Sequence, residues 1–209
     1  MKLFIREACV ENLDQVIKAK EKGADRVELC DRLDLDGLTP SRELIRASIA
    51  SGIPVRVMIR PRSGNFLYSE EELAEMTDSI NFCKDVGAEG VVFGIQQPDG
   101  HLNYKQIDRL LKISFPLKVV IHKVIDETPD PVRSVKRLMK IDGVTGVLTS
   151  GGMNRTAFEG EKALIDMVKI AGNKFEIIAA GKITDKNVKE LHEILGARAY
   201  HGKLIVGVL

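Results

Sequence analysis

Short apolar segments alternate along this chain with longer segments in which apolar residues recur every three or four positions. Most of the short segments are apolar throughout, which is typical of strands that are buried on both faces of a parallel sheet. Eight of them are recognisable, at residues 3–9, 26–30, 55–59, 90–93, 117–122, 143–148, 175–179 and 197–201. The last of these is the weakest.

The segments between the apolar runs have the periodicity of amphipathic helices. Stripes of apolar residues lie within 73–83, 107–111, 132–139 and 188–195. Residues that can cap a helix start stand before several of these segments, at Ser41, Ser69 and Thr184. Strands that alternate with helices predict right-handed crossovers and a parallel sheet.

Two parallel architectures are compatible with this alternation. An open, doubly wound sheet would carry a glycine-rich phosphate-binding turn after its first strand, and residues 9–13 contain no glycine. We therefore predict a single (β/α)8 TIM-barrel domain over residues 1–209. Because few residues follow the last predicted strand, we expect the last helix to be short or missing. The barrel flank there would be bare unless a partner subunit covers it.

Composition excludes several classes of partner. The 31 basic and 30 acidic residues give a net charge of +1 and are scattered, so we expect no nucleic-acid partner. No apolar run approaches the roughly 18 residues of a membrane helix, so we expect no membrane partner. The N-terminus does not resemble a signal peptide, and the three cysteines lack disulfide-framework spacing. These features predict a cytoplasmic protein with free thiols.

Polar residues accumulate where the predicted strands end, which is where (β/α)8 barrels place their functional sites. The candidates for catalysis are Glu7, Glu28, Arg60, His122 and Asp126. The candidates for substrate binding are Arg62, Ser150, Gly151, Gly181 and His201. A barrel interior built only for stability is filled by branched apolar side chains.

Each candidate also has a structural interpretation. The two glutamates could pair with the arginines in a buried ion network, since buried charges are rarely left unpaired. His122 could be a hydrogen-bonded core histidine. The turn at 149–152 could be no more than a tight turn, or it could be a nest of backbone N–H groups that binds an anion.

Cys9 and Cys30 are the candidate metal ligands. Each follows a glutamate by two residues, at the ends of neighbouring predicted strands that lie about 4.8 Å apart. If the two ends are level, the sulfurs approach one another and could hold a soft cation such as Cu(I). Zinc prefers about four ligands, and no third or fourth cysteine is nearby. The alternative is that both residues are small apolar fillers of the barrel.

Several segments resemble the CutC copper homeostasis family. They are Arg-Val-Glu-Leu-Cys at 26–30, Gly-Leu-Thr-Pro-Ser at 37–41, Val-Met-Ile-Arg-Pro-Arg at 57–62, Phe-Leu-Tyr-Ser at 66–69, Gly-Val-Val-Phe-Gly at 90–94 and Leu-Thr-Ser-Gly at 148–151. The resemblance implies a (β/α)8 barrel, a cytoplasmic location, a homo-oligomer (dimer or tetramer) and a role in copper handling. It also implies Cu(I) ligation by two cysteines at the barrel mouth, which match Cys9 and Cys30.

Two segments depart from the family pattern. His-Lys-Val-Ile-Asp at 122–126 stands where the family has His-Arg-Ala-Phe-Asp, and it keeps the histidine and the aspartate. The glycine-rich segment after the seventh strand is reduced to Ala-Ala-Gly-Lys at 179–182, which weakens the expectation of an anion site there.

Two functions are compatible with these residues. The first, which we favour, is copper homeostasis through Cu(I) bound at Cys9 and Cys30, with nearby charged groups setting the thiolate fraction. The second is a lyase, isomerase or hydrolase that acts on a small anionic ligand. In the second, Arg60 and Arg62 would clamp the anion, and His122 would act as an acid–base group oriented by Asp126.

Overall fold

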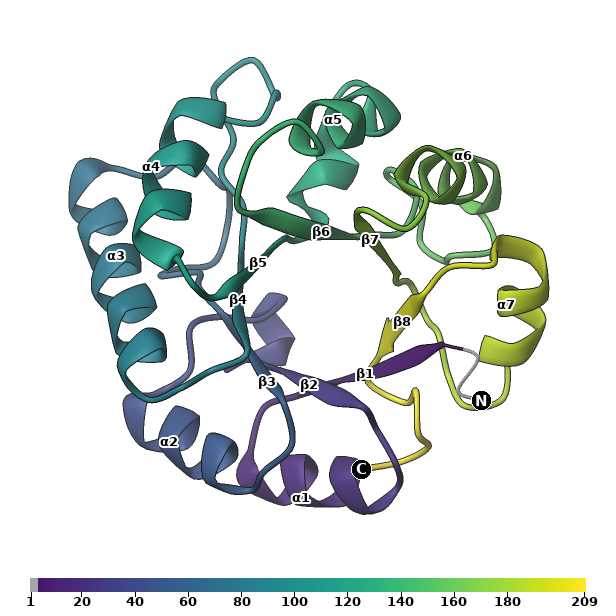
Figure 1. The fold of residues 1–209 in the computed structure, drawn as a ribbon, viewed down its shortest axis with the longest axis horizontal. Coiled ribbons are helices and arrows are strands. Elements are labelled where there is room, and N and C mark those ends of the chain that lie inside the picture. Colours follow the sequence, from purple (N-terminus) through teal and green to yellow (C-terminus); the bar gives the residue numbers. More distant parts are fainter. Residues whose placement is uncertain (1–3) are drawn as a thin grey trace.

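The computed structural model describes residues 4–209, which form a closed barrel of eight parallel strands with helices around it (Figure 1). The strands pair in chain order, and β8 closes the barrel against β1. Their bounds are β1 Ile5–Val10, β2 Arg26–Leu29, β3 Val55–Met58, β4 Gly90–Phe93, β5 Lys118–Ile121, β6 Val144–Thr149, β7 Glu176–Ala179 and β8 Ala199–Gly202. Each overlaps a predicted segment, so the predicted fold class is confirmed. Leu3, the first residue of the first predicted strand, lies outside the described residues.

Seven α-helices and two short 3₁₀ helices connect the strands in residues 4–209. The α-helices are α1 Leu13–Glu21, α2 Arg42–Ala50, α3 Glu70–Asp85, α4 Tyr104–Ser114, α5 Pro131–Leu138, α6 Glu161–Ala171 and α7 Val188–Leu195. The 3₁₀ helices are η1 Leu33–Leu35 and η2 Lys123–Glu127, and both lie in loops that follow strand ends.

Local sequence determines where helix α3 begins and which of its faces is buried. Ser69 accepts a hydrogen bond from the Glu72 N–H, and the Glu72 carboxylate accepts one from the Ser69 N–H, at 3.2 and 2.8 Å. This reciprocal capping box satisfies two N–H groups at the helix start. The predicted stripe then faces the barrel, because Leu73, Met76 and Ile80 are all buried.

The chain after β8 differs from a standard barrel. Among the described residues no helix follows β8, as predicted. Residues 203–209 instead form a turn and short bridges, and Ile205 and Val206 are buried. A Cβ on Gly207 would lie 3.6 Å from Asp185 and 3.9 Å from Lys22, so this segment lies between the start of α7 and the end of α1 (Figure 1). The flank expected to be bare is therefore partly covered by the chain itself.

The barrel interior has two layers of different chemistry. Side chains two residues apart on a strand point the same way, so β1 and β2 each send a column of residues inward. Towards the carboxyl ends the interior layer contains the two mouth cysteines and apolar residues, namely Cys9, Cys30, Met58, Val92, Val120, Leu148, Ile178 and Ala180. Below it lies a layer of charged groups.

No helix in the described part of the chain is long and apolar enough to cross a membrane.

Candidate functional site

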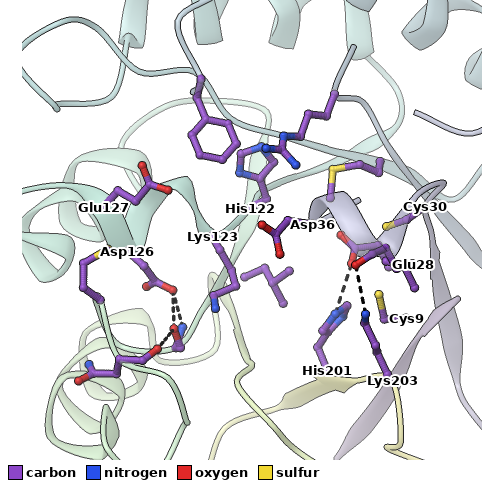
Figure 2. Close-up of a pocket in the computed structure, with 18 of the residues that line it drawn as sticks. Cys9, Glu28, Cys30, Asp36, His122, Lys123, Asp126, Glu127, His201 and Lys203 are labelled. Atoms are coloured by element: carbon purple, nitrogen blue, oxygen red, sulfur yellow. Dashed lines mark hydrogen bonds and ion pairs between the residues drawn. The ribbon is translucent and has the colours of Figure 1, made fainter. Parts of the chain in front are cut away.

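A cavity of about 440 Å³ opens at the carboxyl ends of the strands (Figure 2). Eight of the twelve site residues named from the sequence line it, namely Cys9, Glu28, Cys30, Arg60, His122, Asp126, Ser150 and His201. The other four, Glu7, Arg62, Gly151 and Gly181, are not among the lining residues. The barrel thus gathers residues from six strands around one opening.

The two mouth cysteines lie side by side. Cys9 pairs in register with Glu28 on β2, and Cys30 directly follows β2, where its N–H donates to the Val10 carbonyl at 2.9 Å. The two sulfurs and one carboxylate oxygen of Glu28 all lie within 4.8 Å of one another (Figure 2). Both thiols are free and buried. The geometry required for a two-sulfur site is therefore present.

The pKa values of the two thiols are shifted in opposite directions. The Cys30 thiol donates to the Cys9 sulfur, and this contact lowers the pKa of Cys9 to about 5 although burial opposes the shift. His201 lowers it further through a hydrogen bond and its positive charge. The same contact, together with burial and the negative charge of Glu28, raises the pKa of Cys30 well above its usual value. The pair therefore holds one negative charge and one proton.

His201 connects this sulfur pair to two buried glutamates. Its Nδ1 lies 2.9 Å from Glu7 Oε1, and its Nε2 lies 3.4 Å from Glu28 Oε2. Burial alone would lower the pKa of His201, but Glu28, Cys9 and Glu7 together raise it well above its usual value. Burial raises the pKa of Glu28 to about 8. Within residues 4–209, Glu28 Oε1 has no hydrogen-bond partner.

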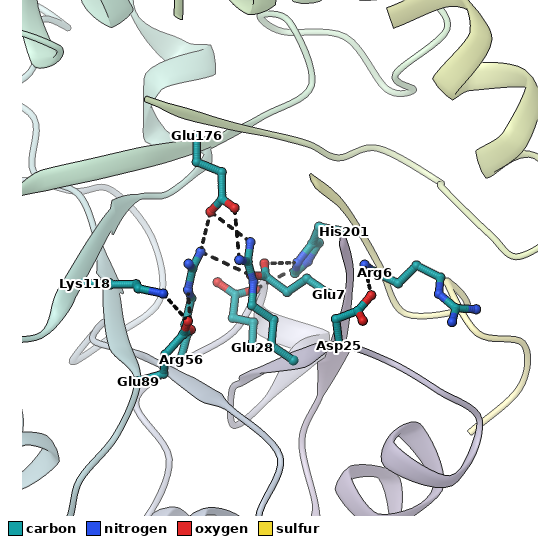
Figure 3. Close-up of polar contacts among 10 residues, drawn as sticks. Arg6, Glu7, Asp25, Glu28, Arg56, Glu89, Lys118, Glu176 and His201 are labelled. Carbon is teal, nitrogen blue, oxygen red and sulfur yellow. Dashed lines mark hydrogen bonds and ion pairs between the residues drawn. The ribbon is translucent and has the colours of Figure 1, made fainter. Parts of the chain in front are cut away.

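Glu7 lies below the cavity in a buried ion network (Figure 3). Its carboxylate pairs with Arg26 and lies 3.5 Å from Arg56 Nη1. Both arginines also bind Glu176, at 3.0 and 2.9 Å. Burial would raise the pKa of Glu7, but Arg26, His201 and Arg56 outweigh it and hold the pKa well below its usual range. Glu7 thus belongs to a structural network, with arginine partners that the sequence analysis did not single out.

The sequence did contain a signal for the two arginine partners of Glu7. Arg26 is the first residue of β2 and Arg56 lies within β3, two residues before Glu28 and Met58 respectively. The period of two along a strand places both side chains on the inner face of the barrel. A charged residue at such a position needs a buried counter-charge.

Arg60 and Arg62 do not form a common anion clamp. The Arg60 guanidinium donates to the carbonyls of Leu35, Gly37 and Gly64, at 2.8, 3.1 and 3.0 Å. It therefore fixes two loops at the cavity edge. Arg62 lies outside the cavity and binds Glu72 and backbone carbonyls of the 63–67 loop.

His122 is a buried, neutral histidine. Its Nδ1 accepts a hydrogen bond from the Val124 N–H at 3.1 Å, and its ring lies 4.8 Å from the Phe66 ring. Burial, reinforced by the charge of Arg60, lowers the pKa of His122 to about 3. The proton of the neutral ring is therefore on Nε2. In the described structure this atom has no hydrogen-bond partner.

Asp126 binds the turn at 149–152 and does not orient His122, which corrects the expected acid–base pair. Its carboxylate accepts from the Thr149 hydroxyl, from the Ser150 N–H and hydroxyl at 2.8 and 2.7 Å, and from the Gly152 N–H at 3.0 Å. The backbone donors that were expected to form an anion nest are thus already occupied by a side chain of the same protein.

The two glycines expected to bind substrate are used within the fold. The Gly151 N–H donates to the Thr149 hydroxyl at 3.0 Å, and the Gly181 carbonyl accepts from the Ala157 N–H at 3.0 Å. A Cβ on Gly151 would lie 2.4 Å from the Gly160 carbonyl, so a larger residue would displace that loop. Both glycines allow the 150–160 segment to approach the barrel closely.

Two further sulfur residues of the cavity were not predicted from the sequence. Among the described residues, the thioethers of Met58 and Met153 line it together with the two thiols. Met58 is buried at the end of β3, whereas Met153 is exposed on the rim. A methionine at the end of an apolar strand is normally interpreted as a core residue. The position of Met58 one strand away from Cys30 was the sequence signal that could have placed it at the cavity.

The geometry defines a class of protein, a (β/α)8 barrel with a buried thiol pair at its mouth. The sequence model of the CutC family matches residues 4–206, and the chain belongs to this family. The family membership expected from short segments is therefore confirmed over nearly the whole chain.

Individual relatives agree with this assignment. The chain is 37% identical over 201 residues to the human copper homeostasis protein cutC homolog, covering 95% of this chain and 72% of the human protein. It is 38% identical over 198 residues to a CutC family protein of Aliivibrio fischeri strain MJ11, covering 93% of this chain and 79% of that protein.

Solved structures agree as well. The crystal structure of CutC from Streptococcus agalactiae matches with a TM-score of 0.91 at 33% identity, covering 97% of this chain and 99% of that one. Dihydrodipicolinate synthase from Bacillus anthracis matches with a TM-score of 0.65 at 13% identity, covering 99% of this chain and 71% of that one. This second likeness concerns the fold alone.

Proposed function

We propose that this protein serves copper homeostasis by binding one Cu(I) ion between Cys9 and Cys30 at the barrel mouth. The observation that carries the proposal is the approach of two buried sulfurs and a Glu28 oxygen to within 4.8 Å at the edge of a cavity. Thiolates are soft ligands that select Cu(I) over harder cations. The names of the family's relatives, which refer to copper homeostasis, support the same choice.

The charge of the site favours a monovalent ion. Without metal, the Cys30 thiol proton lies between the two sulfurs. A Cu⁺ ion that replaces this proton leaves the net charge of the buried pair unchanged, and one proton is released to solvent. A divalent ion would add a positive charge beside the protonated His201, and uncompensated buried charge is costly.

The proposal includes a cytoplasmic location, because free thiols persist in a reducing compartment. A homo-oligomer remains a prediction from the family resemblance. The alternative enzymatic function depended on a His122–Asp126 pair and an Arg60–Arg62 clamp. Neither is assembled in residues 4–209, so we do not propose it.

Anaerobic titration of the reduced protein with Cu(I), in competition with a chromogenic Cu(I) chelator, tests the proposal. We expect one equivalent to bind to the parent protein and the Cys9→Ser, Cys30→Ser double variant to lose this site. Cys83→Ala is the matched control, because it removes a buried thiol on α3 that does not line the cavity. The proposal fails if the double variant binds Cu(I) as tightly as the parent.

A further inference from the structure

We infer that the Met58 thioether is a third ligand of the copper ion, so that the mouth presents three sulfurs from three consecutive strands. This inference rests on the proposed function and specifies its metal selectivity. Met58 lines the cavity, is buried, and belongs to the same interior layer as Cys9 and Cys30.

Strand register places Met58 beside Cys30. Strands β2 and β3 pair so that Leu29 lies opposite Val57. Met58 ends β3 and Cys30 directly follows β2, so the two residues come next after this pair, and parallel neighbours lie about 4.8 Å apart. Because Cys30 also neighbours Cys9 on its other side, the three side chains form a row across the mouth.

Gly37 shows that the ends of the two side chains meet at one place. A Cβ built on Gly37 would lie 3.2 Å from Cys30 Sγ and 3.7 Å from Met58 Cε. The methyl carbon Cε, which is bonded directly to the thioether sulfur, therefore lies near the Cys30 thiol. The Gly37 carbonyl accepts from Arg60 at 3.1 Å, which holds this loop over both side chains.

The chemistry of a thioether suits this position. It is soft and neutral, so it adds a ligand for Cu(I) without adding charge to a buried site. Methionine has three rotatable side-chain bonds, which let its sulfur turn toward an ion without backbone movement. Zinc is bound by thiolate, imidazole and carboxylate ligands, and would gain little from a thioether. Met58 should therefore raise affinity for Cu(I) selectively.

The test is a Met58→Leu variant, which keeps a buried apolar side chain of similar volume. In the chelator competition we expect its Cu(I) affinity to fall about tenfold or more, an effect of the size seen when metal sites lose supporting groups. Its Zn²⁺ affinity should stay within about twofold of the parent, as expected for an ion that does not use the thioether. Copper-edge X-ray absorption should show three sulfur scatterers in the parent and two in the variant.

Two matched controls separate ligation from packing. Met153→Leu changes the exposed rim thioether of the same cavity, and Met76→Leu changes a buried methionine on α3 outside it. Both should bind Cu(I) as the parent does. Selenomethionine-labelled parent protein supplies a readout without mutation, since selenium-edge absorption should detect a copper neighbour.

The outcomes distinguish the two claims. If the parent binds no Cu(I), the proposed function and this inference both fail. If binding requires the two cysteines but Met58→Leu is unchanged and selenium detects no copper, Met58 is an apolar filler and only the inference is overturned. An equal loss of Cu(I) and Zn²⁺ affinity in Met58→Leu would also overturn it.

Discussion

Acidification tests the buried, neutral state of His122. Burial and the charge of Arg60 lower the pKa of this imidazole to about 3, whereas in the unfolded chain it returns to about 6.5. Between these values the unfolded chain binds a proton that the native protein does not, so stability falls as the pH falls below about 6.5. At about 1.36 kcal/mol per pH unit, lowering the pH to about 5 should cost about 2 kcal/mol through this residue alone.

Urea unfolding of the parent and of His122→Gln at pH values of about 7.5 and 5 measures this cost. Glu28 and His201 titrate in both proteins, so the difference between the two pH dependences isolates His122. We expect the decrease in unfolding free energy to be about 2 kcal/mol smaller in the variant. His101→Gln, at an exposed histidine, should behave as the parent does. Equal decreases in the parent and in His122→Gln would refute the neutral, buried assignment.

Two further predictions concern the charged groups. Arg56→Met removes a buried guanidinium that compensates Glu7, so we expect the unfolding free energy to fall by about 3–5 kcal/mol, and a loss below about 1 kcal/mol in urea unfolding would contradict this. Asp126→Asn replaces one of the two carboxylate oxygens that accept from the Ser150 and Gly152 N–H groups. We expect the unfolding free energy to fall by about 1–3 kcal/mol and amide hydrogen exchange at these positions to become faster. Unchanged protection of both amides would show that another group satisfies them.

The fold was predictable because its signals are local. Strand segments such as 55–59 and 90–93 are predominantly apolar, and the observed strands β3 and β4 lie within them. The approach of Cys9 to Cys30 was predictable for a related reason. Adjacent parallel strands have a regular spacing, so residues at two neighbouring strand ends must come close if the ends are level.

The partners of the polar groups were not predictable in the same way. Asp126 was expected to turn toward His122, four residues away, but it binds donors more than twenty residues further along the chain. Arg60 was expected to face a ligand, but it satisfies backbone carbonyls of two loops. Sequence identifies which residues reach the mouth, whereas the loop conformations decide which donors and acceptors they find there.

The charged layer below the cavity helps to determine which of the two sulfurs carries the negative charge. Arg26 keeps Glu7 ionised, and the Glu7 carboxylate holds His201 through its Nδ1. The positively charged His201 then stabilises the thiolate of Cys9, while the hydrogen bond to Cys9 and burial keep the proton on Cys30. An ion network below the cavity thus favours one thiolate in advance, so only the second thiol must lose its proton when a soft cation binds.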